Sequence, residues 1–117
     1  MATATQRTRP LIAVLSGVPL FVEAMNAAFE GIADLAPVSV DDQLAQGLVR
    51  AYHPDVAIIE GCDPALIDES VPCLRIDLAS REVSLRRGGT WTAYDVELSP
   101  EAIRNVAVAA IYGGEPA

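Results

Sequence analysis

The sequence predicts an α/β domain in which parallel strands alternate with helices. Two continuous apolar runs, 11–16 (LIAVLS) and 56–59 (VAII), are typical of strands that a parallel sheet buries on both faces. A helical pattern and another short strand separate them, and such alternation implies right-handed crossovers. With 117 residues and 51% hydrophobic content, the chain can bury a core of its own. We therefore expect one domain over 1–117, with flexible ends at 1–9 and 113–117.

The next elements follow from periodicity and from end signals. Apolar residues recur three and four positions apart over 19–32, which predicts a helix that packs one face on the sheet, with proline in its first turn. A short run at 36–40 predicts the second strand. Asp41 or Asp42 can cap a second helix by accepting hydrogen bonds from free backbone N–H groups. That helix ends at His53, because the residue before a proline is pushed out of helical geometry. A charged imidazole there would interact favourably with the helix dipole, so we interpret His53 as a helix end rather than a catalytic residue.

The carboxyl-terminal third breaks the alternation. Only a short helix or turn fits before 73–79 (CLRIDLA), which predicts a fourth strand. A fourth crossover helix is then missing, and 81–98 has two β-rich arms around Gly88 and Gly89, a hairpin-turn signal because glycine tolerates positive φ. Ser99 followed by proline and glutamate opens a last amphipathic helix.

Composition excludes several classes of function. The net charge of −8 disfavours nucleic acid as the main partner. No apolar run approaches the ~20 residues of a membrane helix, and we interpret the apolar start as a core strand rather than a secretory signal. All 8 basic residues are arginine, which excludes Schiff-base, Ser-Lys and P-loop lysine chemistry. Cys62 and Cys73 lack the spacing of a disulfide framework or zinc site, so we expect free thiols in the cytoplasm.

Two segments resemble the receiver domain of bacterial response regulators. Residues 16–31 (SGVPLFVEAMNAAFEG) are similar to the start of its first helix, and 54–60 (PDVAIIE) to its third strand, with the spacing that the family has. The Ser-Pro-Glu opening of the last helix is similar too. The resemblance covers 10–80 and 97–112, whereas 81–96 departs from it. It implies a flavodoxin-like, parallel five-stranded sheet with flanking helices, in which a β-hairpin replaces the fourth helix.

The positions of the family's phosphorylation pocket are all altered. Receivers need a magnesium ion held by an acidic pair, an aspartate nucleophile, a lysine and a switch hydroxyl, because negative charge that develops on the phosphoryl group must be neutralised. These positions here are occupied, in that order, by Ser16 and Gly17, Glu60, Val96 and Asp77. The resemblance therefore implies a stand-alone pseudo-receiver that cannot be phosphorylated, a signalling or scaffolding module with no enzyme activity, metal or cofactor.

Glu60 and Asp77 leave other interpretations open. Glu60 can imitate a phosphorylated aspartate, anchor a partner or loop by a hydrogen bond, or simply face water at a strand end. If Asp77 lies beside it, each carboxylate raises the pKa of the other, as in many acid/base sites, although no catalytic partner is evident in the sequence. The alternative function is a small-ligand-binding domain that uses the strand-end crevice around Ser16, Glu60 and Asp77.

The hairpin is the candidate surface for a protein partner or a homodimer. Arg81, Arg86 and Arg87 form the only local basic cluster, which is either solvated or a contact patch. Trp91 and Tyr94 are spaced to lie on opposite faces of a regular strand, one packing inward and one exposed. Exposed aromatic residues beside arginines are enriched at protein interfaces. The other interpretation is a hairpin that only covers the sheet edge.

Overall fold

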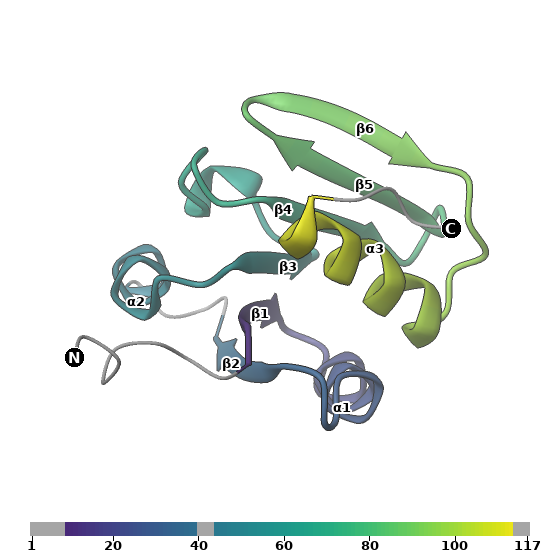
Figure 1. The fold of residues 1–117 in the computed structure, drawn as a ribbon, viewed down its shortest axis with the longest axis horizontal. Coiled ribbons are helices and arrows are strands. Elements are labelled where there is room, and N and C mark those ends of the chain that lie inside the picture. Colours follow the sequence, from purple (N-terminus) through teal and green to yellow (C-terminus); the bar gives the residue numbers. More distant parts are fainter. Residues whose placement is uncertain (1–8, 40–43, 114–117) are drawn as a thin grey trace.

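The computed structural model describes residues 9–39 and 44–113, which form a mixed six-stranded sheet with helices on both faces (Figure 1). The elements in chain order are β1 (Leu11–Ser16), α1 (Pro19–Ala28), β2 (Asp34–Val38), α2 (Ala45–Tyr52), β3 (Val56–Glu60), the 3₁₀ helix η2 (Pro64–Leu66), β4 (Cys73–Asp77), β5 (Glu82–Arg87), β6 (Thr90–Tyr94) and α3 (Pro100–Tyr112). The strand order is β2-β1-β3-β4-β5-β6. Strands β1 to β4 are parallel, and β5 and β6 are antiparallel to their neighbours.

The prediction of a purely parallel, five-stranded sheet is wrong beyond β4. The link from Asp77 to Glu82 is too short for a parallel crossover, which needs about a dozen residues or more, so the chain turns back and β5 pairs antiparallel with β4. The predicted hairpin forms, but it extends the sheet as β5 and β6 instead of taking the place of a helix. No described segment forms a fifth parallel strand.

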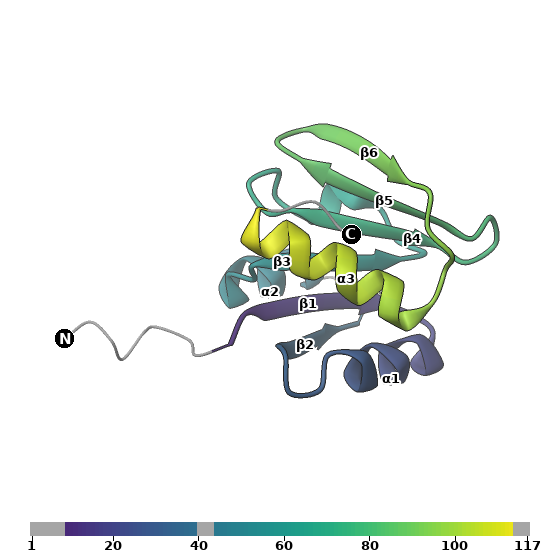
Figure 2. The same cartoon turned by 45° about the vertical axis from the view of Figure 1, so that its right-hand side comes forward.

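Strands β1 and β3 occupy the centre of the sheet and are covered on both faces. Ile12, Val14 and Ile58 face the layer of α1 and α3, whereas Leu15 and Ile59 face α2 and the β3–β4 loop (residues 61–72). Figure 2 shows α1 and α3 on the same side of the sheet. Each of these five side chains is fully buried, as the continuous apolar runs predicted.

Helix boundaries follow the predicted signals closely. Helix α1 begins at Pro19 but ends at Ala28, so Ile32 is 39% exposed beyond it. Helix α2 ends at His53, which adopts a left-handed conformation as the C-cap. The proposed caps at 41–42, and residues 1–8 and 114–117 of the predicted flexible ends, lie outside the described residues.

The last helix and the hairpin turn form as predicted. Ser99 Oγ accepts a hydrogen bond from the N–H of Ala102 at 3.1 Å, and Pro100 occupies the first turn of α3. Gly88 and Gly89 are the central residues of the turn, with φ angles of 62° and 84°. Positive φ at both central residues is the mark of a type I′ turn. None of the described helices is long and apolar enough to cross a membrane.

Arg86 of β5 holds the β3–β4 loop against the sheet. Its side chain is only 8% exposed. The guanidinium donates to the carbonyl oxygen of Ile67 at 2.8 Å, and to those of Pro64 and Asp68 at 3.4 Å each. Its Nε is buried and has no described partner. The loop therefore packs over the face of the sheet opposite to α3, and its residue Ile67 is buried against the strands.

Candidate functional site

The site lies where β1 and β3 end side by side. Ser16 and Glu60 are paired in the parallel register as the last residues of the two strands. The chain leaves β1 through α1 on one face of the sheet, and α2 enters β3 from the other face. Such a reversal of direction is the switch point at which open α/β sheets bind ligands.

Ser16 and Glu60 are joined by a short hydrogen bond. Ser16 Oγ donates to Glu60 Oε1 at 2.6 Å, and the N–H of Val18 donates to the same Oγ at 2.9 Å. A hydroxyl bound to a carboxylate makes a charge-assisted bond, stronger than a neutral one. Glu60 therefore anchors the start of the β1–α1 connection through Ser16, the hydrogen-bonding role that was one of its three interpretations. Gly17, exposed between Ser16 and Val18, offers no side-chain ligand.

Asp77 forms a turn and does not pair with Glu60. Its Oδ1 accepts hydrogen bonds from the N–H groups of Ala79 at 3.0 Å and Ser80 at 3.1 Å. The Ser80 N–H is the largest cause that lowers the pKa of Asp77, and the charge of Arg75 also lowers it. The predicted raising of the pKa of Asp77 by Glu60 is wrong. Because Glu60 pairs with Ile76 and alternate residues face opposite sides, Asp77 projects from the other face of the sheet.

An open depression of about 500 Å³ lies beside these strand ends. Among its lining residues are Glu60, Cys62, Asp63, Arg75 and Asp77. The lining includes one arginine and three carboxylates and is therefore net negative, so the depression favours groups that are cationic or that carry hydrogen-bond donors. No three His, Cys, Asp or Glu side chains among the described residues are grouped so as to hold a metal ion.

Cys62 and Arg75 are site residues that the sequence interpretation missed. Burial, and the charges of Glu60 and Asp63, raise the pKa of the Cys62 thiol, although a backbone hydrogen bond opposes them. The thiol is therefore a weak nucleophile at neutral pH. Both residues had a usable signal in the sequence: Cys62 lies two residues after the end of β3, and Arg75 stands between buried residues of β4.

Val96 does not take the place of the family's lysine at this site. It lies in the link between β6 and α3 and packs, partly buried, against the core on the α3 side. The reversal at β5 explains this position, because no described parallel strand carries Val96 to the carboxyl end of the sheet. The depression at β3 and β4 does not include it.

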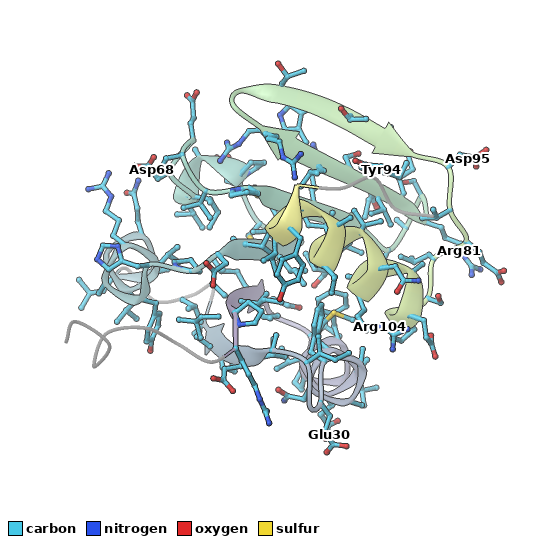
Figure 3. All side chains as sticks on the ribbon, in the orientation of Figure 1. Glu30, Asp68, Arg81, Tyr94, Asp95 and Arg104 are labelled. Carbon is cyan, nitrogen blue, oxygen red and sulfur yellow. The ribbon has the colours of Figure 1, made fainter. Side chains whose placement is uncertain are left out.

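The predicted basic cluster on the hairpin does not form. Arg81 lies in the β4–β5 turn with a φ of 62°, at the end of the hairpin where Figure 3 also shows Asp95. Arg86 and Arg87 lie at the opposite end and project from opposite faces of β5. Arg87 donates to the carbonyl oxygen of Ala110 in α3 at 2.8 Å. The three arginines therefore act separately.

Trp91 and Tyr94 lie on opposite faces of β6, as predicted. Tyr94 is partly buried against the α3 side of the core. Trp91 is 40% exposed on the other face, and its ring centroid lies 5.8 Å from Cζ of its cross-strand neighbour Arg86. This distance is within the range of a cation–π contact. The hairpin thus presents an indole supported by a buried guanidinium.

Comparison with known proteins does not identify the chain. No protein-family model, curated protein or solved structure matches it. The function is therefore inferred from the geometry of the strand ends and of the hairpin.

Proposed function

We propose that this chain is a pseudo-receiver, a signalling or scaffolding module of the bacterial cytoplasm that binds another protein without being phosphorylated. The strand order β2-β1-β3-β4 agrees with the doubly wound order of flavodoxin-like domains as far as β4. The observation that carries the proposal is the 2.6 Å hydrogen bond between Ser16 and Glu60 at the switch point. This bond gives Glu60, which stands at the position of the receiver's phosphoacceptor aspartate, a structural role.

The residues around Glu60 favour binding over phosphoryl transfer. Transfer requires cations that neutralise the phosphoryl oxygens. The sequence has no lysine, and the neighbouring acids Asp63 and Asp77 add negative charge to the depression. Ser16 and Gly17 supply no carboxylate for magnesium. Recognition of a protein would then fall to the exposed hairpin around Trp91.

The test is an NMR amide titration with magnesium and then beryllofluoride, which stands in for a phosphoryl group. We expect no saturable shift at Ser16, Gly17 or Glu60. The triple variant S16D/G17D/E60D restores the acidic residues of the pocket, and we expect it to gain magnesium-dependent shifts. Saturable shifts in the unaltered protein would overturn the proposal.

A second candidate function is the binding of a small ligand in the depression. The juxtaposition of Arg75 with Asp63 and Asp77 favours it, because it offers donors and acceptors in one open site of about 500 Å³. A ligand that binds only the folded state raises the melting temperature. A thermal-shift series with small amines, amino acids and phosphates, repeated on Arg75→Ala, separates the two functions: a stabilisation that the variant loses supports ligand binding.

A further inference from the structure

The two edges of the sheet differ in their protection. At one edge, β2 carries Pro37 and the charged residue Asp34, both of which discourage pairing with another strand. At the other edge, β6 consists of TWTAY, without proline or charge, and all of its residues but Tyr94 are exposed. Figures 1 and 2 show β6 at the rim of the molecule, with no described element beyond it. An unprotected strand of high β-propensity is a template for pairing.

The type I′ turn determines which backbone groups face outward. Arg87 and Thr90 flank the two-residue turn, and such flanking residues form a hydrogen-bonded pair. Because backbone groups alternate in direction along a strand, Thr92 also faces β5, whereas the N–H and C=O groups of Trp91 and Ala93 point to the open edge. The free edge thus offers the backbone groups of two residues with one residue between them.

We propose that β6 pairs antiparallel with β6 of a second copy of this chain, around a two-fold axis at Thr92. In this register Trp91 of each copy lies opposite Ala93 of the other, and their outward N–H and C=O groups bond across the interface. The large indole meets a small side chain, and Thr92 meets its own copy. This inference rests on the proposed function, which makes the hairpin the binding surface. It identifies the partner as a second copy of this chain.

Charge supports the antiparallel arrangement in spite of the net charge of −8. The charged residues of the hairpin divide between its two ends. Near the turn lie Arg86 and Arg87. Near the other end lie Arg81, Glu82, Asp95 and Glu97. Glu69 also approaches the turn, with Oε1 3.3 Å from where a Cβ on Gly89 would stand. With Glu69 counted, the turn end of the hairpin has a net charge of +1, and the other end has a net charge of −2. Antiparallel pairing places these unlike ends together, and parallel pairing would place acid against acid.

Cysteine cross-linking tests the register. Across a non-hydrogen-bonded antiparallel pair the Cα atoms are about 4.5 Å apart, within reach of a disulfide. In a Cys62→Ser background, Thr92→Cys should therefore form a covalent dimer under mild oxidation. The matched control Thr90→Cys should form no covalent dimer, because the residue opposite it in the other copy is Tyr94. Equal cross-linking of both variants, or of neither, would overturn the register.

The oligomeric state tests the pairing itself. Light scattering after size exclusion, over a series of concentrations, should show a dimer of the unaltered chain. Ala93→Pro removes an outward N–H without touching the β5 ladder, and we expect it to weaken dimerisation about tenfold or more. Ala93→Ser keeps both the N–H and a small side chain opposite Trp91, and it should leave the dimer intact. A monomer at every concentration would overturn the pairing but leave the pseudo-receiver proposal standing, because the beryllofluoride titration decides that proposal separately.

Discussion

Arg86→Ala should loosen the β3–β4 loop while leaving the centre of the sheet folded. The guanidinium is the described link between β5 and the carbonyl oxygens of Pro64, Ile67 and Asp68. Its truncation removes the hydrogen bonds and also the aliphatic stem that packs beneath the loop. The buried Ile67 carbonyl would then lose its charged donor.

The magnitude follows from the strongest of these contacts. A hydrogen bond from a charged donor contributes about 1.5–3 kcal/mol, and the 2.8 Å bond to Ile67 is of this kind. The two bonds of 3.4 Å add little, and the partnerless Nε already offsets part of the gain. We therefore expect Arg86→Ala to lower the free energy of unfolding by about 2–3 kcal/mol.

The assay combines urea unfolding with amide hydrogen exchange. The neighbouring variant Arg87→Ala is the control: this side chain is exposed and makes one described bond, to Ala110, so its loss should cost below about 1 kcal/mol. In Arg86→Ala, exchange should accelerate over residues 61–72 more than over β1 and β3. Equal losses of stability in the two variants, or uniform acceleration across the sheet, would refute the assignment of this arginine as the tether of the loop.

Three more expectations concern the strand ends. Ser16→Ala should lower the free energy of unfolding by about 1–2 kcal/mol through the lost bond to Glu60, measured in urea; a value near zero would contradict the anchoring role. The pKa of Asp77 is lowered in the folded protein, so its charged form stabilises the fold at neutral pH. This contribution is lost as the pH falls from the ordinary pKa of 3.8 through the lower pKa of the folded state. Asp77→Asn should thus be less stable at pH 7, and unfolding at pH 3 should show a smaller difference. At pH 8, Ellman's reagent should modify Cys62 before Cys73, whose pKa burial raises to about 11; equal rates would contradict this.

The parallel half of the sheet was predictable because its signals are local and strong. Runs of buried apolar residues define β1 and β3, and the Ser99 cap and its proline define the start of α3. Gly88 and Gly89 gave the turn. Each of these features depends on a few neighbouring residues, so no knowledge of the tertiary structure was needed.

The site was harder to predict because it depends on which strands meet and on which face a side chain lies. Placing the fourth strand over 73–79 extended it past Asp77 and hid the turn in which this residue accepts two N–H groups. An Asp side chain readily accepts a hydrogen bond from the backbone N–H two residues further on, as Asp77 does from Ala79, and this turn signal would have corrected the assignment. The burial of Arg86 was not predictable, because an arginine of a hairpin is ordinarily solvated and the loop that covers it is remote in the sequence.

The position of α3 has a consequence for biosynthesis. Ile103, Val106 and Ala107 of this last helix complete the core that also contains Phe21 and Met25 of α1. While the ribosome is still making residues before 100, the strands on that side of the sheet have only α1 to cover them. The nascent chain must therefore keep an apolar surface exposed until α3 emerges, and we expect chaperones to bind it during that interval.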